Sequence, residues 1–147
     1  MRILEIYIDG ASKGNPGPSG IGVIICQGSR TLKNISSYIG QATNNIAEYT
    51  ALIYALKEAA ILKAEALKIN TDSQLLARQL NKTYKVRHKN IIGLYNQAVN
   101  LLAEFKVFSI NHIPREENTG ADKLATAAIK REFKKPAFQQ AGNVLSK

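Results

Sequence analysis

Apolar residues recur along the chain with two different spacings, and the spacing changes at a few clear points. Residues 3–9 form a run of β-branched, aliphatic and aromatic side chains, which predicts a strand. Further strands are predicted at 20–27 and 30–40, joined by a hairpin turn at Gly28 and Ser29. The chain is therefore expected to begin with three consecutive antiparallel strands.

A helical spacing begins after Thr43, Asn44 and Asn45, which are residue types that favour the start of a helix. We expect a helix over 45–63. Its apolar face would consist of Ile46, Tyr49, Ile53, Leu56 and Ala60. A strand at 66–72 then follows, of the kind that returns to a sheet after a crossover helix.

Two helices are predicted next, one carrying Leu75, Leu76 and Leu80 and one over 90–105. A strand at 107–113 ends at Pro114, and a loop at 115–118 leads to a helix over 119–133, which Asn118 can cap. The order βββαβααβα predicts an α/β fold, with a five-stranded mixed sheet and helices on both faces.

The length of 147 residues suits one domain. We expect this domain to occupy 1–133 and a C-terminal tail, 134–147, to be partly disordered, because the tail shows no periodicity. Membrane-spanning segments are not expected, because no apolar run approaches the roughly 18 residues that a span needs. A single cysteine, Cys26, and a first strand that leaves no room for a signal peptide favour a cytoplasmic protein, which we expect to be a monomer.

The charge balance is strongly basic, with 20 Lys and Arg against 11 Asp and Glu, and a pI near 9.7. No acidic residue occurs between Ser73 and Ala103, where Arg78, Lys82, Lys85, Arg87 and Lys89 lie. A basic surface can simply favour solubility. A sector of one sign, however, is what contacts with phosphates require, so the charge favours a nucleic-acid partner.

Four acidic residues are notable for their positions. Asp9 and Asp72 end predicted strands, while Glu48 and Asp122 lie in the first turns of predicted helices. Each has an ordinary alternative explanation, because acids are common at strand ends and complement the helix dipole. In the predicted topology, however, all four reach one end of the sheet, where their repulsion would need cations. Oxygen ligands suit Mg²⁺, and a two-metal site can cleave a phosphodiester.

Several short motifs, in this order, resemble the type 1 ribonuclease H (RNase HI) family over residues 3–133. They are Ile8-Asp9-Gly10-Ala11-Ser12, Gly14-Asn15-Pro16-Gly17, Thr43-Asn44-Asn45, Ala47-Glu48-Tyr49, Thr71-Asp72-Ser73-Gln74, Arg115-Glu116-Glu117-Asn118 and Ala121-Asp122-Lys123-Leu124. The resemblance implies an RNase H-like fold and endonucleolytic hydrolysis of the RNA strand of RNA–DNA hybrids.

The resemblance also implies roles for individual residues. Asp9 would bridge two Mg²⁺ or Mn²⁺ ions, with Glu48, Asp72 and Asp122 as the other carboxylates. Substrate contacts would fall to Gly10, Asn15, Asn44, Asn45 and Gln74, and Thr43 would meet a phosphate of the DNA strand. Amide side chains in such positions can reach the 2′-hydroxyls that distinguish RNA from DNA.

Two features depart from many bacterial members of this family. A mobile histidine often lies between the last strand and the last helix, and His112 has the matching distance to Asp122. The segment Ile113-Pro114-Arg115 aligns better with a compact short-loop subgroup, which places His112 inside the strand and makes Arg115 the expected substitute. The tryptophan-containing basic protrusion is also missing, so Lys82–Lys89 is only a candidate for hybrid binding.

Two other functions remain open at this point. The first is a non-catalytic module that binds RNA–DNA hybrids, although the presence of all four carboxylates argues against loss of activity. The second is another nuclease with the same fold. Exonucleases of this fold usually begin with Asp-x-Glu, whereas Asp9 is followed by Gly10 and Ala11.

Overall fold

Five strands form one mixed sheet in the computed structural model, which describes residues 1–82 and 85–141. The strands are β1 (Ile3–Ser12), β2 (Gly17–Gln27), β3 (Arg30–Ala42), β4 (Ala66–Thr71) and β5 (Val107–His112). Their order across the sheet is β3-β2-β1-β4-β5. The first three pair antiparallel, whereas β4 is parallel to β1 and β5 is parallel to β4. The predicted sheet is confirmed.

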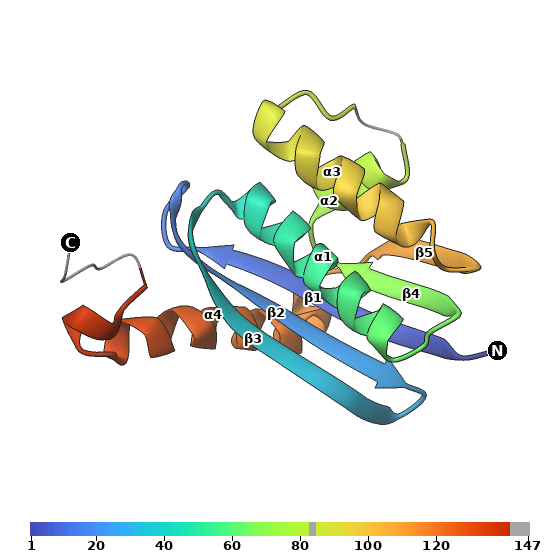
Figure 1. Cartoon of the computed structure of the whole chain (residues 1–147), viewed down its shortest axis with the longest axis horizontal. Coiled ribbons are helices and arrows are strands. Elements are labelled where there is room, and N and C mark those ends of the chain that lie inside the picture. The colour runs from blue at the N-terminus through green and yellow to red at the C-terminus, as the bar shows by residue number, and fades with distance from the viewer. Residues whose placement is uncertain (83–84, 142–147) are drawn as a thin grey trace.

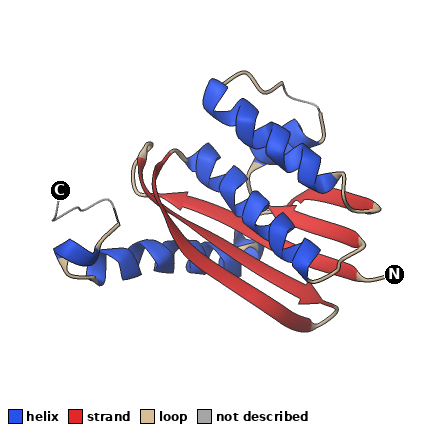
Figure 2. Ribbon diagram, viewed as in Figure 1, coloured by secondary structure: helices blue, strands red, loops and turns tan. Residues whose placement is uncertain are grey.

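Helices cover both faces of this sheet (Figure 1, Figure 2). They are α1 (Asn44–Ile61), α2 (Gln74–Leu80), α3 (Lys89–Leu102) and α4 (Thr119–Lys134), with short 3₁₀ turns η1 (Arg115–Glu117) and η2 (Ala137–Gln139). α1, α2 and α3 lie on one side, and α4 crosses the other beneath β1, β2 and β3. The predicted order of elements is also confirmed. No helix in the described part of the chain is long and apolar enough to cross a membrane.

The main core lies between the sheet and α1. Alternate residues of β1, Leu4, Ile6 and Ile8, are fully buried, because a strand presents every second side chain to the same face. Tyr49 and Leu56 of α1 are fully buried against them. Burial of these side chains, at roughly 1.5–3 kcal/mol each, holds α1 across the middle of the sheet.

On the opposite face, glycines allow α4 to approach the backbone of β2. A Cβ atom at Gly22 would lie 2.0 Å from the Ala121 carbonyl oxygen, and one at Gly20 would lie 2.4 Å from that of Ala125. No side chain fits at either position. The N-terminal half of α4 therefore contacts the sheet through the main chain, at a fixed separation.

Several predicted boundaries differ from the structure. β1 continues three residues beyond Asp9, because residues 10–12 still pair with β2 after β4 has ended. The second predicted helix of the pair begins at Lys89 and ends at Leu102 rather than at Phe105. Ala60, predicted to belong to the apolar face of α1, is exposed, and Ala59 is buried in its place.

The described part of the C-terminal tail returns to the end of α4. The Ala141 N–H and the Lys135 ammonium both bond to the carboxylate of Glu132, which is only 4% exposed. These bonds give residues 135–141 a defined path beside the helix. The rest of the predicted tail, 142–147, and Tyr84 in the basic stretch lie outside the described residues.

Candidate active site

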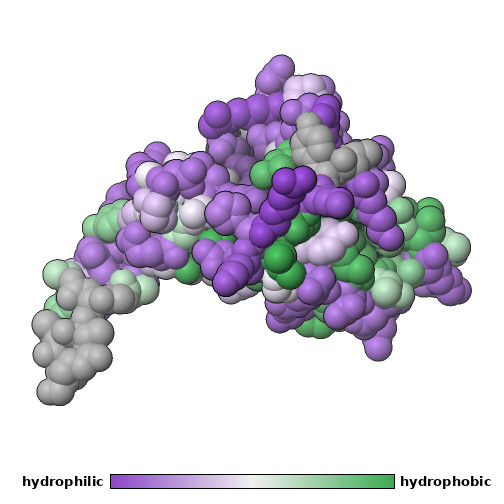
Figure 3. Space-filling view, turned by 90° about the horizontal axis from the view of Figure 1, so that it is seen from above, coloured by the Kyte–Doolittle hydropathy of each residue, from purple (hydrophilic) through white to green (hydrophobic). Residues whose placement is uncertain are grey.

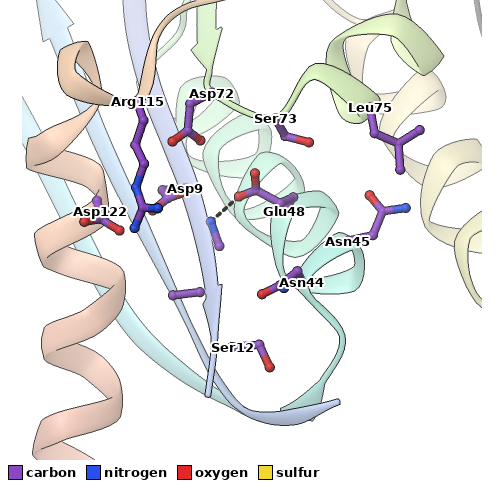
Figure 4. Close-up of a pocket in the computed structure, with 12 residues that line it drawn as sticks. Asp9, Ser12, Asn44, Asn45, Glu48, Asp72, Ser73, Leu75, Arg115 and Asp122 are labelled. Atoms are coloured by element: carbon purple, nitrogen blue, oxygen red, sulfur yellow. Dashed lines mark hydrogen bonds between the residues drawn. The ribbon is translucent and has the colours of Figure 1, made fainter. Parts of the chain in front are cut away.

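A cavity of about 500 Å³ opens beside β1 at the point where β4 ends (Figure 4). All four predicted carboxylates line it, together with Arg115. Its lining residues are Asp9, Gly10, Ala11, Ser12, Asn44, Asn45, Glu48, Asp72, Ser73, Leu75, Arg115 and Asp122. The chain therefore brings acidic residues from four separate elements into one place.

Two consecutive residues of β1 face the two helices that complete the site. Asp9 pairs with Gly22, which contacts the first turns of α4, so Asp9 lies on the α4 face. Gly10 lies on the α1 face, where a Cβ atom would be only 2.4 Å from the Ala47 carbonyl carbon. Because Gly10 has no side chain, α1 comes close enough for Glu48 to approach Asp9.

Glu48 lies just beyond the first turn of α1 rather than in it, because the helix begins at Asn44, one residue earlier than predicted. Thr43 caps the helix, with its hydroxyl oxygen accepting a hydrogen bond from the Ile46 N–H at 3.2 Å. The Gly10 N–H donates to the Glu48 carboxylate, which is 7% exposed. This bond joins the carboxylate directly to the main chain of β1 and limits its movement.

Asp72 leaves the end of β4 in the direction of the cavity. The pairing of β4 with β1 stops at Thr71, and Ser73 then caps α2 by accepting a hydrogen bond from the Leu76 N–H at 3.1 Å. The Ser73 N–H donates to the Thr71 hydroxyl at 3.0 Å. Asp72 is thus held in a tight turn between a strand and a helix.

Asp122 comes from the first turn of α4, as predicted, and Figure 4 shows it beside Asp9. The predicted cap is wrong in its chemistry, because the Asn118 side chain makes no hydrogen bond to the first turn of α4. Its amide instead donates to the Ile8 carbonyl oxygen at 2.8 Å. Asn118 occupies the N-cap position but links the helix to β1.

The cavity concentrates negative charge in a poorly hydrated place. Carboxylate oxygens of Asp9, Glu48 and Asp72 lie within 4.8 Å of one another. Burial raises the pKa of Asp9 from 3.8 to about 10, and the neighbouring Glu48, Asp72 and Asp122 carboxylates add to this rise. Burial also raises the pKa of Glu48, although the hydrogen bond from Gly10 opposes the rise. Such a cluster favours protons or bound cations.

The donor set fits a hard divalent cation. All the ligand atoms are carboxylate oxygens, which Mg²⁺ and Mn²⁺ accept. Three of them already lie close enough to share one ion, and Asp122 adjoins Asp9 from the other side. Arg115 also points toward Asp9 and Asp122, yet none of the ion pairs among the described residues involves it.

A second cavity of about 410 Å³ continues from the first toward α3. Asn44, Asn45 and Leu75 line both cavities, whereas the second cavity adds Asn15 and Thr43 among the predicted residues. The Asn15 side-chain oxygen accepts a hydrogen bond from the Asn44 N–H at 3.0 Å. The predicted amide residues other than Gln74 therefore form one continuous surface.

The remaining predicted residues fall outside the cavities. Gln74 is exposed at the start of α2 and lines neither of them. His112 is the last residue of β5, inside the strand as expected from the alignment with the short-loop subgroup, and it does not line the acidic cavity. Four lining residues have no role predicted from the sequence, namely Ala11, Ser12, Ser73 and Leu75. The available signal is that the first three lie in the motifs around Asp9 and Asp72.

Comparison with known proteins places this geometry in a family. A family model described as reverse transcriptase-like matches residues 7–128. The bifunctional protein Rv2228c of Mycobacterium tuberculosis is 40% identical over 131 residues, which are 88% of this chain and 36% of that protein. Ribonuclease HI of Halobacterium salinarum is 40% identical over 86% of this chain and 64% of that protein. The chain thus spans between about one third and two thirds of these relatives.

Solved structures agree with these relatives. RNase H1 from Halobacterium salinarum is 38% identical, covers 88% of this chain and 98% of its own, and has a TM-score of 0.85. LC11-RNase H1, solved in complex with an RNA/DNA hybrid, is 37% identical with the same TM-score, over 88% of this chain and 99% of its own. The protein has the RNase H-like fold, and the chain belongs to the ribonuclease HI family.

Proposed function

We propose that this protein is an endoribonuclease that hydrolyses the RNA strand of RNA–DNA hybrids with the help of divalent cations. The observation that carries the proposal is the gathering of Asp9, Glu48, Asp72 and Asp122 in one cavity. A cluster of unpaired acids costs stability, and it has a clear purpose when it binds cations. The similarity to LC11-RNase H1, whose structure holds an RNA/DNA hybrid, supports the choice of substrate.

The carboxylates would hold two Mg²⁺ ions, for which Mn²⁺ could substitute. Asp9 lies between Glu48 and Asp72 on one side and Asp122 on the other, so it is suited to bridge the ions. Bound there, the ions would supply an activated water and stabilise charge on the scissile phosphate. The chain itself contributes rigidity, because Glu48 and Asp122 are attached to helices that contact the sheet through main-chain atoms.

Hybrid recognition would use the amide surface that continues from the acidic cavity. The Asn15 side-chain oxygen accepts a bond from the Asn44 N–H, and the Asn15 amino group can donate to the substrate. Asn44 and Asn45 lie beside it, Gly10 lines the acidic cavity, and Thr43 would meet a phosphate of the DNA strand. Gln74, exposed at the start of α2, would reach the hybrid from outside the cavities.

Basic residues beyond the cavities would add contacts with phosphates. Lys82, Lys85, Arg87 and Lys89 are exposed on the segment that leads from α2 into α3. Figure 3, seen from above α3, shows a largely hydrophilic surface. Contacts of this kind depend strongly on ionic strength, so we expect hybrid affinity to fall as salt is raised.

Arg115 is the proposed substitute for the family's mobile histidine. It lines the acidic cavity, is exposed, and extends toward Asp9 and Asp122. A guanidinium in this place can bind the phosphate product at any physiological pH, because it stays positively charged, whereas a histidine must first be protonated. We expect Arg115→Ala to lower kcat by about tenfold, in line with the loss of one charged contact. The matched variant Lys123→Ala removes an exposed charge of α4 and should leave kcat unchanged.

The protein would act as a monomer in the cytoplasm. Its four carboxylates all come from one chain, and Cys26 is a free thiol, which suits a reducing compartment. Gel filtration together with light scattering would test the monomer. A stable dimer would contradict this part of the proposal without affecting the proposed chemistry.

The decisive experiment is hydrolysis of a labelled RNA–DNA hybrid, run in parallel with Mg²⁺ and with Mn²⁺. Wild-type protein should cut the RNA strand internally, EDTA should stop the reaction, and Asp9→Asn should be inactive. Equal cleavage signals from wild type and Asp9→Asn would contradict an enzyme and favour a non-catalytic module that binds hybrids. Faster digestion of single-stranded DNA than of the hybrid would identify a different nuclease on the same fold.

A further inference from the structure

Asn118 is almost completely buried, at 1% exposure, although it begins a helix at the edge of the acidic cavity. Its side-chain amide donates to the Ile8 carbonyl oxygen at 2.8 Å, across 110 positions of sequence. Its side-chain oxygen has no hydrogen-bond partner among the described residues. The orientation of the amide is fixed by chemistry, because the opposite orientation would set two oxygens against each other.

This one residue touches three segments that carry lining residues of the cavity. Ile8 is the last residue of β1 that pairs with β4, and its carbonyl belongs to the peptide bond that leads into Asp9. The Asn118 carbonyl oxygen accepts from the Asp122 N–H at 3.1 Å. The Asn118 N–H donates to the Arg115 carbonyl oxygen at 2.9 Å. The last two are main-chain bonds that any residue joining a 3₁₀ turn to a helix would make. The side-chain bond to Ile8 is therefore the contact that is particular to Asn118.

The backbone of Asn118 supports the same reading. Its φ of −118° and ψ of 25° depart from the extended conformation that Thr43 and Ser73 adopt at the starts of α1 and α2. Those two residues cap their helices through their hydroxyl groups, whereas Asn118 does not cap α4. A buried polar group with an unsatisfied oxygen is costly and is kept where it serves a purpose.

We infer that Asn118 is a positioning residue, which sets the placement of Asp122 relative to Asp9 by holding the first turn of α4 to the Ile8 carbonyl. The inference rests on the proposed function, since it concerns the same cation site. Asp9 and Asp122 come from different elements. The contact of α4 with Gly22 sets the distance of the helix from the sheet, and the Asn118 bond ties the start of the helix directly to the residue before Asp9. Supporting residues of this kind change metal affinity by 10–100-fold in other proteins.

The test is calorimetric titration with Mn²⁺ of Asn118→Leu, which keeps the shape and removes the donor. Asn118→Ala, which also removes the donor, is the second variant in case the first does not fold. The control is Asn81→Leu. Asn81 also ties a helix end to a strand, through a 3.1 Å bond to the Ile110 carbonyl oxygen, but neither of these two residues is adjacent in sequence to an acidic residue of the cavity.

We expect both Asn118 variants to bind Mn²⁺ about 10–100-fold more weakly than wild type, and Asn81→Leu to bind like wild type. In hybrid cleavage, the Asn118 variants should lose kcat by a similar factor, with KM unchanged within about threefold, because the hybrid surface is untouched. A purely structural role would lower the unfolding temperature of all the variants and leave the Mn²⁺ affinity unchanged.

Two results would overturn the inference: folded Asn118 variants that bind Mn²⁺ as tightly as wild type, or a wild-type protein that binds no Mn²⁺. Failure of the proposed function has a different signature. Wild-type protein would then still bind Mn²⁺ more tightly than the Asn118 variants do, yet it would not cleave the hybrid.

Discussion

Acidic side chains at the two ends of the parallel strands have opposite environments, and their pKa values shift in opposite directions. Where β4 begins, Glu65 accepts hydrogen bonds from the Lys106 ammonium at 2.9 Å and from the Arg2 N–H at 3.1 Å, and these bonds lower its pKa. Where β4 ends, Asp9 and Glu48 are buried among other acids, and their pKa values rise. At one end the acid has a basic partner within the chain, whereas none of the ion pairs among the described residues involves an acid of the other end.

The largest expected effect comes from removing Asp9, the central carboxylate of the acidic cluster where β4 ends. Asp9→Asn should lower hybrid cleavage at least about 1,000-fold, because the carboxylate proposed to bridge the cations is lost. In EDTA at pH 8, the same change should raise the free energy of unfolding by about 1–2 kcal/mol, because wild-type protein must protonate Asp9 on folding and the variant need not. Steady-state kinetics and urea unfolding measure the two effects. A variant that is both inactive and less stable than wild type would contradict the view that the acidic cluster costs stability when no cation is bound.

The next effect concerns the contact that brings Asp122 to the cavity. Gly22→Ala would place a Cβ atom 2.0 Å from the Ala121 carbonyl oxygen, so α4 must move away from the sheet. We expect a loss of about 2–3 kcal/mol in the free energy of unfolding, together with weaker activation by Mg²⁺.

Gly93→Ala is the matched control for this change, because a Cβ atom at Gly93 in α3 meets nothing within 4 Å. It should stabilise the protein by about 0.5–1 kcal/mol and leave Mg²⁺ activation unchanged. Equal behaviour of the two glycine variants in thermal unfolding would show that the contact between β2 and α4 does not matter.

A smaller effect should appear in the dependence of stability on pH. The folded protein keeps protons on Asp9 and Glu48 that the unfolded chain releases, so the folded state binds more protons above pH 4. Their contribution to stability is therefore full below pH 4 and is lost as the pH rises toward 10. In EDTA, we expect the free energy of unfolding to fall by about 1–2 kcal/mol between pH 5 and pH 9.

Mg²⁺ should reduce this decline, because it neutralises the same carboxylates and binds better once their protons are gone. Chemical unfolding over the pH series, with EDTA or with Mg²⁺, measures both curves, and Asp9→Asn should give a flatter EDTA curve. A stability in EDTA that rises steadily up to pH 9 would refute the assignment of raised pKa values.

The smallest effect belongs to the opposite end of the sheet. Lys106→Ala removes the ion pair between Lys106 and Glu65. Both side chains of this pair are exposed. Exposed pairs contribute little, so we expect no measurable change in the unfolding temperature or in hybrid cleavage. A clear loss of activity in this variant would mean that the two ends are coupled.

Much of this fold could be predicted from the sequence, because apolar residues recur along a strand or a helix at the spacing that places them on its buried face. Leu4, Ile6 and Ile8 alternate, and the helical spacing of Tyr49, Ile53 and Leu56 locates α1. The predicted strand ends and helix starts singled out the four carboxylates, and the resemblance to a family then implied their roles. Periodicity is less reliable where two residues compete for the edge of a helix face, as the exchange of Ala60 for Ala59 illustrates.

The contacts that shape the site could not be predicted in this way. Nothing local distinguishes Gly22, which contacts α4, from Gly93, where an added Cβ atom would meet nothing within 4 Å. An asparagine before a helix predicts a cap, and only the folded structure reveals that Asn118 bonds to a strand 110 positions away. Such contacts depend on which segments meet, and a single sequence does not record this.

The hydrogen bond from the Gly10 N–H to Glu48 has a consequence for dynamics. Since this amide belongs to β1 and its acceptor to α1, its proton can exchange with solvent only when the helix lifts from the strand. Hydrogen–deuterium exchange at Gly10 would therefore act as a built-in reporter of how often the pocket opens. Comparing its rate with that of an amide in the middle of β1 would separate local breathing from global unfolding.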